Sequence, residues 1–117
     1  MDRIRDRISR QREIVKQVLS EYHRLSLNAV ESTIESFLVF DETREHYLLL
    51  LMGWREDERV KTVMIHVRLQ EAKVWIEEDW TEAGVATDLL KEGIEREEIV
   101  LGFHQPELRR YTEFAVV

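Results

Sequence analysis

Residues 45–69, "EHYLLLLMGWREDERVKTVMIHVRL", hold two apolar runs on either side of a short charged loop. Each run is too short to span a membrane as a helix, and both are rich in residues that strands favour. The stretch therefore predicts two antiparallel strands, 45–54 and 60–69, joined by the polar segment between them.

The strand pattern continues on both sides of this pair. "TIESFLVF" (33–40) precedes it across "DETR", and "KVWIE" (73–77) follows it across "QEA". Four strand candidates joined by short polar loops predict an antiparallel meander. A later run, "EEIVLGF" (97–103), is a candidate for a fifth strand.

Two other segments have a helical period. In residues 2–25 the apolar side chains form one stripe, which only Gln11 interrupts. A second helix is predicted over 81–92, with Thr81 as its N-cap and Gly93 as its left-handed end. We therefore expect an α+β fold in a single domain, residues 1–117: an antiparallel β-meander of four to five strands with an N-terminal helix and a second helix before the last strand.

Composition excludes several classes of protein. The chain has no cysteine, so it cannot form a disulfide scaffold or a thiolate metal site. Its net charge is −7, whereas a nucleic-acid-binding domain usually carries a basic surface that attracts phosphate. The charge therefore argues against a nucleic-acid-binding protein. The charged N-terminus does not resemble a signal peptide, and the longest apolar run, "YLLLLMGW", is no longer than a strand. A cytoplasmic protein is expected, with no membrane partner.

The loop lengths predict a register, and the register predicts which side chains share a face of the sheet. We pair residue 40 with 45, 54 with 60, and 69 with 73. The first face then holds Ile34, Leu38, Phe40, Tyr47, Leu49, Leu51, Val63, Ile65, Val67, Leu69 and Trp75. The second face holds Phe37, Val39, His46, Leu48, Leu50, Met52, Trp54, Met64, His66, Val74 and Ile76, with Glu35, Thr62 and Arg68 among them.

The second face is too apolar to be left in water. Two helices can cover one face of such a sheet but not both, so this face needs the C-terminal tail, a second subunit or another partner. We expect a homodimer, a higher homo-oligomer or a hetero-complex, with Leu50, Met52 and Met64 in the contact.

Candidates for chemistry are few. His46 and His66 share the second face and could bind a metal with Glu35, but two ordinary, partly buried imidazoles are the favoured interpretation. The acids at 77–79, with Glu82, could hold Mg²⁺. At a helix start, acids also complement the helix dipole, so Asp79, Thr81 and Glu82 are interpreted as a helix-cap motif. We expect no catalytic residue, no metal and no cofactor.

The last residues are unusual for a chain end. "FHQPELRRYTEF" (103–114) combines aromatic rings with arginines, which is typical of interface hot spots. We expect a turn at Pro106 that returns the aromatic residues to a packed surface, either the chain's own sheet or a neighbouring subunit. Arg109 should find a carboxylate or carbonyl acceptor. The predicted interface residues of this tail are His104, Pro106, Arg109, Tyr111 and Phe114.

Two long segments carry a family resemblance. "VWIEEDWTEAGVATDLLKEGI" (74–94) and "EEIVLGFHQPELRRYTEFAVV" (97–117), with the preceding "LLLMGW", resemble the XisI family, the controlling factors named for excision of the fdxN DNA element in nitrogen-fixing bacteria. The resemblance runs from the first helix to the last residue. "GIEREEI" (93–99) departs from it, because the family has a proline in that turn.

The resemblance implies a small intracellular α+β protein from a family whose members are not established enzymes and are associated with a companion called XisH, which looks like a nuclease-fold protein. The leading hypothesis is a non-enzymatic regulatory or accessory protein that acts through protein contact, with an XisH-like partner. One alternative is a metal-dependent nuclease component or enzyme using Asp79, Glu82 and His104. Another is a DNA-binding module that uses the arginine-rich first helix.

Overall fold

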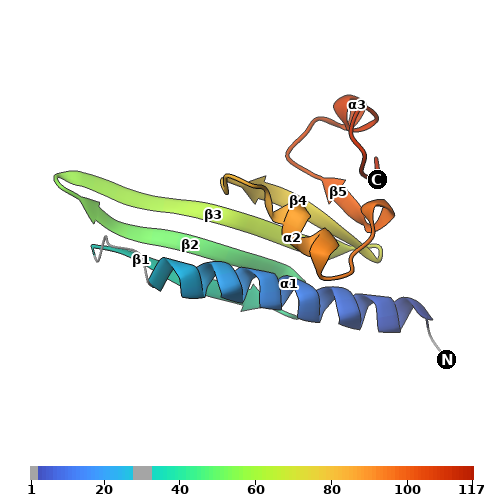
Figure 1. Cartoon of the computed structure of the whole chain (residues 1–117), viewed down its shortest axis with the longest axis horizontal. Helices are drawn as coiled ribbons and strands as arrows, with labels where there is room; N and C mark the ends of the chain where they lie inside the picture. The colour runs from blue at the N-terminus through green and yellow to red at the C-terminus, as the bar shows by residue number, and fades with distance from the viewer. Residues whose placement is uncertain (1–2, 28–32) are drawn as a thin grey trace.

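The computed structural model describes residues 3–27 and 33–117 and shows a five-stranded sheet with the two longest helices on one side (Figure 1). The predicted start of the first helix, residue 2, lies outside the described residues. In chain order the elements are α1 (Arg3–Leu27), β1 (Ile34–Asp41), β2 (His46–Arg55), β3 (Glu58–Gln70), β4 (Lys73–Asp79), α2 (Val85–Lys91), the 3-10 helix η1 (Arg96–Glu98), β5 (Ile99–Leu101) and α3 (Pro106–Arg109).

The strands lie in the order β1-β2-β3-β4-β5. The first four form the predicted antiparallel meander, whereas β5 runs parallel to β4 after a crossover through α2. The α+β prediction, with its N-terminal helix and its helix before the last strand, is confirmed, but the sheet is mixed and not purely antiparallel. In the described part of the chain, no helix combines the length and apolar character needed to cross a membrane.

Both α1 and α2 pack on the same face of the sheet, which we call the inner face (Figure 1). The apolar stripe of α1 explains why it lies there, since burying each large side chain stabilises the fold by roughly 1.5–3 kcal/mol. The core that results is made of Val15, Val18, Leu19, Tyr47, Leu49, Ile65, Val67, Leu69, Val74, Ile76, Val85, Leu89, Ile94 and Ile99.

Gln11, the polar residue in the stripe of α1, is fully buried and joins three elements. Its side-chain amide donates hydrogen bonds of 2.8 Å to the Ala72 carbonyl and of 2.8 Å to the Glu98 carboxylate. Burial opposes ionisation of Glu98, but hydrogen bonds from the Glu95 N–H, Gln11 and Arg10 outweigh it and hold the pKa of Glu98 below its usual value. The β3–β4 turn and η1 are thus both fixed to α1.

The predicted register between β2 and β3 is correct for one half of the pair. Leu49 lies opposite Ile65, as predicted, but a β-bulge then places Leu50 opposite Val63. Val63 therefore faces away from the helices, against prediction. Met64 is the unpaired residue of the bulge and packs against the inner core, so its predicted place on the second face is wrong.

The predicted register between β3 and β4 is wrong by one residue. Leu69 lies opposite Val74, because the turn consists of Glu71 and Ala72, both with positive φ (54° and 58°). A one-residue slip exchanges the two faces of a strand. Val74 and Ile76 are therefore in the core, and the Trp75 side chain points to the opposite face. The β1–β2 register is shifted by two residues, which leaves the faces as predicted.

Candidate interaction surface

The face of the sheet opposite the helices, which we call the outer face, is apolar over β1, β2 and β3. Val39 is 44% exposed and Trp54 is 52% exposed, and the side chains between them are only partly covered. Patches of this kind on a small domain mark interaction sites. The apolar residues of this surface are Phe37, Val39, Leu48, Leu50, Met52, Trp54 and Val63. Leu50 and Met52 thus lie where the sequence predicts, and Met64 does not.

Over β4 and β5 the C-terminal tail covers the outer face. Arg109 anchors it: the residue is only 9% exposed, and its guanidinium donates hydrogen bonds of 3.2–3.4 Å to the main-chain carbonyls of Leu101, Gly102, His104 and Val116. Its central carbon lies 5.3 Å from the centre of the Trp75 ring. The prediction that Arg109 finds a carbonyl acceptor is confirmed. Because these donors are rigidly planar, they hold the tail in one position.

A second arginine meets the same ring. The guanidinium of Arg68, from β3, lies 4.9 Å from the Trp75 ring centre and 3.8 Å from the Glu77 carboxylate. The other Glu77 oxygen is buried and has no hydrogen-bond partner. It fits close to β5 because Gly102 is there: a Cβ on Gly102 would lie 2.0 Å from that oxygen. The covered half of the outer face is thus a cation–π cluster closed by the tail.

The end of the tail returns to the sheet. The N–H of Ala115 donates a 2.8 Å hydrogen bond to the Ile99 carbonyl, and Phe114 packs against the core. Pro106 occupies the first turn of α3, as its fixed φ favours. The predicted turn at Pro106 is confirmed, and Phe114 packs on the chain's own domain.

Three apolar side chains between residues 103 and 114 are exposed to solvent. Tyr111 is 72% exposed, and Phe103 and Leu108 are about half exposed. Tyr111 contacts the guanidinium of Arg110, and the His104 ring lies 4.6 Å from the Phe103 ring. Within one chain these residues do not return to a packed surface, so the prediction that they meet a neighbouring subunit or another protein remains a prediction.

His46 and His66 lie side by side on the outer face, as predicted. Nδ1 of His46 is 3.0 Å from Nε2 of His66. Burial, followed by the charge of His46, lowers the pKa of His66. Glu35 is not near them, because it pairs with Met52 towards the other end of β2. No group of three potential metal ligands exists among residues 3–27 and 33–117. The two imidazoles form a hydrogen bond with each other.

The residues predicted as a helix cap form a turn before the helix. The Asp79 carboxylate accepts hydrogen bonds from the Thr81 N–H (2.9 Å), the Thr81 hydroxyl (2.6 Å) and the Val85 N–H (2.7 Å). Gly84, with φ 88°, occupies the N-cap position of α2. The prediction of Thr81 as N-cap is wrong: its hydroxyl accepts the Gly84 N–H (3.2 Å), and the helix begins later. Glu82 is exposed.

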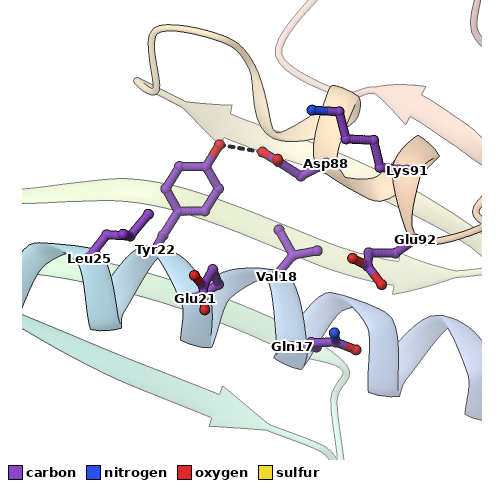
Figure 2. A pocket seen from close by; sticks show the side chains of 8 residues that line it. All are labelled: Gln17, Val18, Glu21, Tyr22, Leu25, Asp88, Lys91 and Glu92. Atoms are coloured by element: carbon purple, nitrogen blue, oxygen red, sulfur yellow. Dashed lines mark hydrogen bonds between the residues drawn. The ribbon is translucent and has the colours of Figure 1, made fainter.

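A groove of about 390 Å³ separates α1 from α2 (Figure 2). The Tyr22 hydroxyl crosses it and donates a hydrogen bond to Asp88. Burial, reinforced by Asp88, raises the pKa of Tyr22 to about 12, so the phenol keeps its proton at neutral pH. The groove lies where the two helices pack together, and no pattern in the sequence predicts it. Its lining residues are Gln17, Val18, Glu21, Tyr22, Leu25, Asp88, Lys91 and Glu92.

Comparison with known proteins adds the family and two related structures. A family model described as XisI protein matches residues 5–116. The fdxN element excision controlling factor XisI from Anabaena variabilis ATCC 29413 is 35% identical, with a TM-score of 0.81 over 95% of this chain and 99% of that one. A XisI-like protein from Anabaena variabilis ATCC 29413 is 32% identical, with a TM-score of 0.82 over 91% of this chain and 95% of that one. No curated protein gives a significant sequence match.

Proposed function

Since the chain belongs to the XisI family, we propose that it is a cytoplasmic controlling factor of DNA element excision that acts through protein contact and catalyses no reaction of its own. The partner we propose is an XisH-like protein. In this role the chain supplies a fixed recognition surface, and the chemistry on DNA belongs to other components.

The observation that carries this proposal is the tail surface of Phe103, Leu108 and Tyr111. These side chains are exposed, yet Arg109 and its four carbonyl acceptors fix the segment that presents them. Exposed aromatic residues on a fixed backbone bind with little loss of conformational entropy, and tyrosine and arginine are both enriched in interface hot spots. A partner protein is the ligand that such a surface fits.

The charges of α1 favour contact with protein over direct contact with DNA. Arg10 donates to Glu98 over 2.7 Å, Arg12 pairs with Glu45, and Lys16 pairs with Glu42 over 2.7 Å. Three basic side chains of the arginine-rich segment are therefore already neutralised within the fold. With a net charge of −7, the chain is repelled by phosphate as a whole.

The test is co-expression of this chain with an XisH-like protein from the same organism, followed by a binding measurement on the purified pair. Leu108→Ser combined with Tyr111→Ala should weaken binding at least about tenfold, since two hot-spot residues carry that much free energy. The matched control is Ile4→Ser combined with Leu25→Ser, which removes exposed apolar side chains from α1. Its binding should equal that of the unmodified chain.

Two results would overturn the proposal. If the tail variant binds as tightly as the control, the tail is not the contact surface. If the purified chain alone cleaves element DNA when Mg²⁺ or Mn²⁺ is added, the non-enzymatic role is wrong.

A further inference from the structure

We propose that the bare half of the outer face, over β1 to β3, binds a second copy of this chain face to face, with a twofold axis that runs parallel to β2. This inference concerns a different surface from the tail and does not rest on the function proposed above.

The apolar centre of the face consists of two rows across the three strands. Phe37, Leu50 and Val63 form one row, and Val39, Leu48 and His66 form the next. Facing sheets pack about 10 Å apart with interdigitated side chains. A second copy of the same face would supply a matching apolar surface.

The charged residues at the two ends of this centre are arranged by strand. One end row reads Glu35, Met52, Lys61, and the other reads Asp41, His46, Arg68. The acids are on β1 and the bases are on β3 in both rows. The face therefore has a negative side, an apolar middle and a positive side.

This pattern is complementary to itself in one orientation. A twofold axis along β2 places β1 of one copy over β3 of the other and keeps the position along the strands, so that Glu35 faces Lys61. An in-plane axis across the strands would place β1 over β1 and bring acids towards acids. Like charges that face each other are destabilising. The charge pattern thus selects both the occupant and its orientation.

The tail sets the limit of this surface. Arg109 lies over Trp75 on β4, so the covered half begins at the strand next to β3. In Figure 1, α3 lies beyond β5, at the end of the sheet away from β1 and α1, so β1 to β3 are left clear of it. β1 of the second copy would then lie over β3 of the first, next to the edge of the tail.

A charge exchange tests the proposal, with self-association of the purified chain measured by sedimentation equilibrium. Glu35→Lys and Lys61→Glu should each weaken the dimer about tenfold, because each change removes two ion pairs and adds repulsion. The combined variant should return to within about twofold of the original affinity. Glu82→Lys and Lys91→Glu make the same charge changes at exposed positions away from the face and should leave association unchanged.

The orientation has its own test, because the chain has no cysteine and a single one can be introduced. With the axis along β2, Leu48→Cys and Met52→Cys should each cross-link to their own copy through a short bis-maleimide. If only one of them does so, the axis crosses the strands and the arrangement is wrong. A chain that stays monomeric at the highest soluble concentration overturns the proposal, and so does a dimer that Leu50→Glu leaves intact while circular dichroism shows a native fold.

Discussion

Both halves of the outer face are apolar, but the chain covers only one of them with its own tail. Over β4, the chain covers Trp75 with its own tail and places two guanidinium groups against the ring. Over β1 to β3, it leaves Val39 and Trp54 half exposed and places opposite charges along opposite sides. A guanidinium on a ring does not by itself distinguish the halves, because Arg59 also lies 5.4 Å from the centre of the Trp54 ring. The difference lies in the tail: a segment folded over the rings indicates cover within the chain, and segregated charges on an uncovered face indicate a second molecule.

Deletion of residues 104–117 should have the largest effect on this contrast, because it makes both halves bare. The deletion removes the Arg109 anchor and the packing of Phe114 against the core. We expect the free energy of unfolding to fall by about 4–5 kcal/mol, together with a loss of solubility. Urea denaturation measures the first and sedimentation the second. A truncated chain that folds and associates normally would show that the tail is not a cover.

Arg109→Ala should lower the free energy of unfolding by about 2–3 kcal/mol, because four carbonyls lose a charged donor. Arg110→Ala is the matched control: its exposed guanidinium contacts the ring and the hydroxyl of the neighbouring Tyr111, and the change should cost less than about 0.5 kcal/mol. Arg109→Lys should recover little, since an ammonium cannot reach all four carbonyls. Equal losses for the two alanine variants would remove Arg109 as the anchor.

Trp75→Ala and Leu48→Ala compare the same truncation on the two halves. Trp75 is packed within the chain, so its loss should destabilise the isolated chain by about 2 kcal/mol. Leu48 faces open surface, so its loss should cost under about 1 kcal/mol in dilute solution and should act mainly on self-association. Thermal denaturation at two protein concentrations separates these effects. If Leu48→Ala gives the larger loss in the dilute sample, the bare half is not bare.

The smallest expected effect lies at the border of the halves, at His66. Burial and the His46 charge lower the pKa of His66, although Glu77 and Glu78 act in the opposite direction and Arg68 adds to the lowering. Below the ordinary histidine pKa of about 6.5, the unfolded chain then binds more protons than the folded one. The free energy of unfolding should therefore decrease as the pH falls below about 6.5, until the folded-state pKa is passed. His66→Gln should flatten this dependence between about pH 5 and 7, and superimposable profiles would contradict it.

The sequence predicts the meander, the N-terminal helix and the inner face of β2 correctly. The spacing of apolar residues and the loop lengths are sufficient to determine these features. The face of β4 was not. Glu71 and Ala72 make a two-residue turn with positive φ and without the glycine or asparagine that would signal it. The bulge that turns Met64 inwards has no signature in the run "VKTVMIHV". The direction of β5 was also hidden, since a short apolar strand reads the same whether it pairs parallel or antiparallel.

The surface could be predicted only in part. The acceptor of Arg109 followed from the chemistry of a planar donor beside aromatic residues, but the choice of main-chain carbonyls depends on how the tail folds. The cap at α2 was misplaced because the Asp79 side chain reaches forward to Val85, across a loop whose geometry short-range rules do not give. Trp75 was assigned to the wrong face with the rest of its strand, so the contact with Arg109 could not be foreseen.

The parallel pairing of β5 also implies an order in which the parts of the fold form. β1 to β4 are joined by short loops and can close as local hairpins within microseconds, whereas β5 must wait for the crossover through α2. The tail leaves the ribosome after all five strands. When residue 103 has left the ribosome, the meander can already have formed. Trp75 and the bare half of the outer face are then both exposed, because the tail has not yet folded. Speed of completion, and any chaperone that shields β4 until residue 109 arrives, should decide how much of this protein is recovered in soluble form.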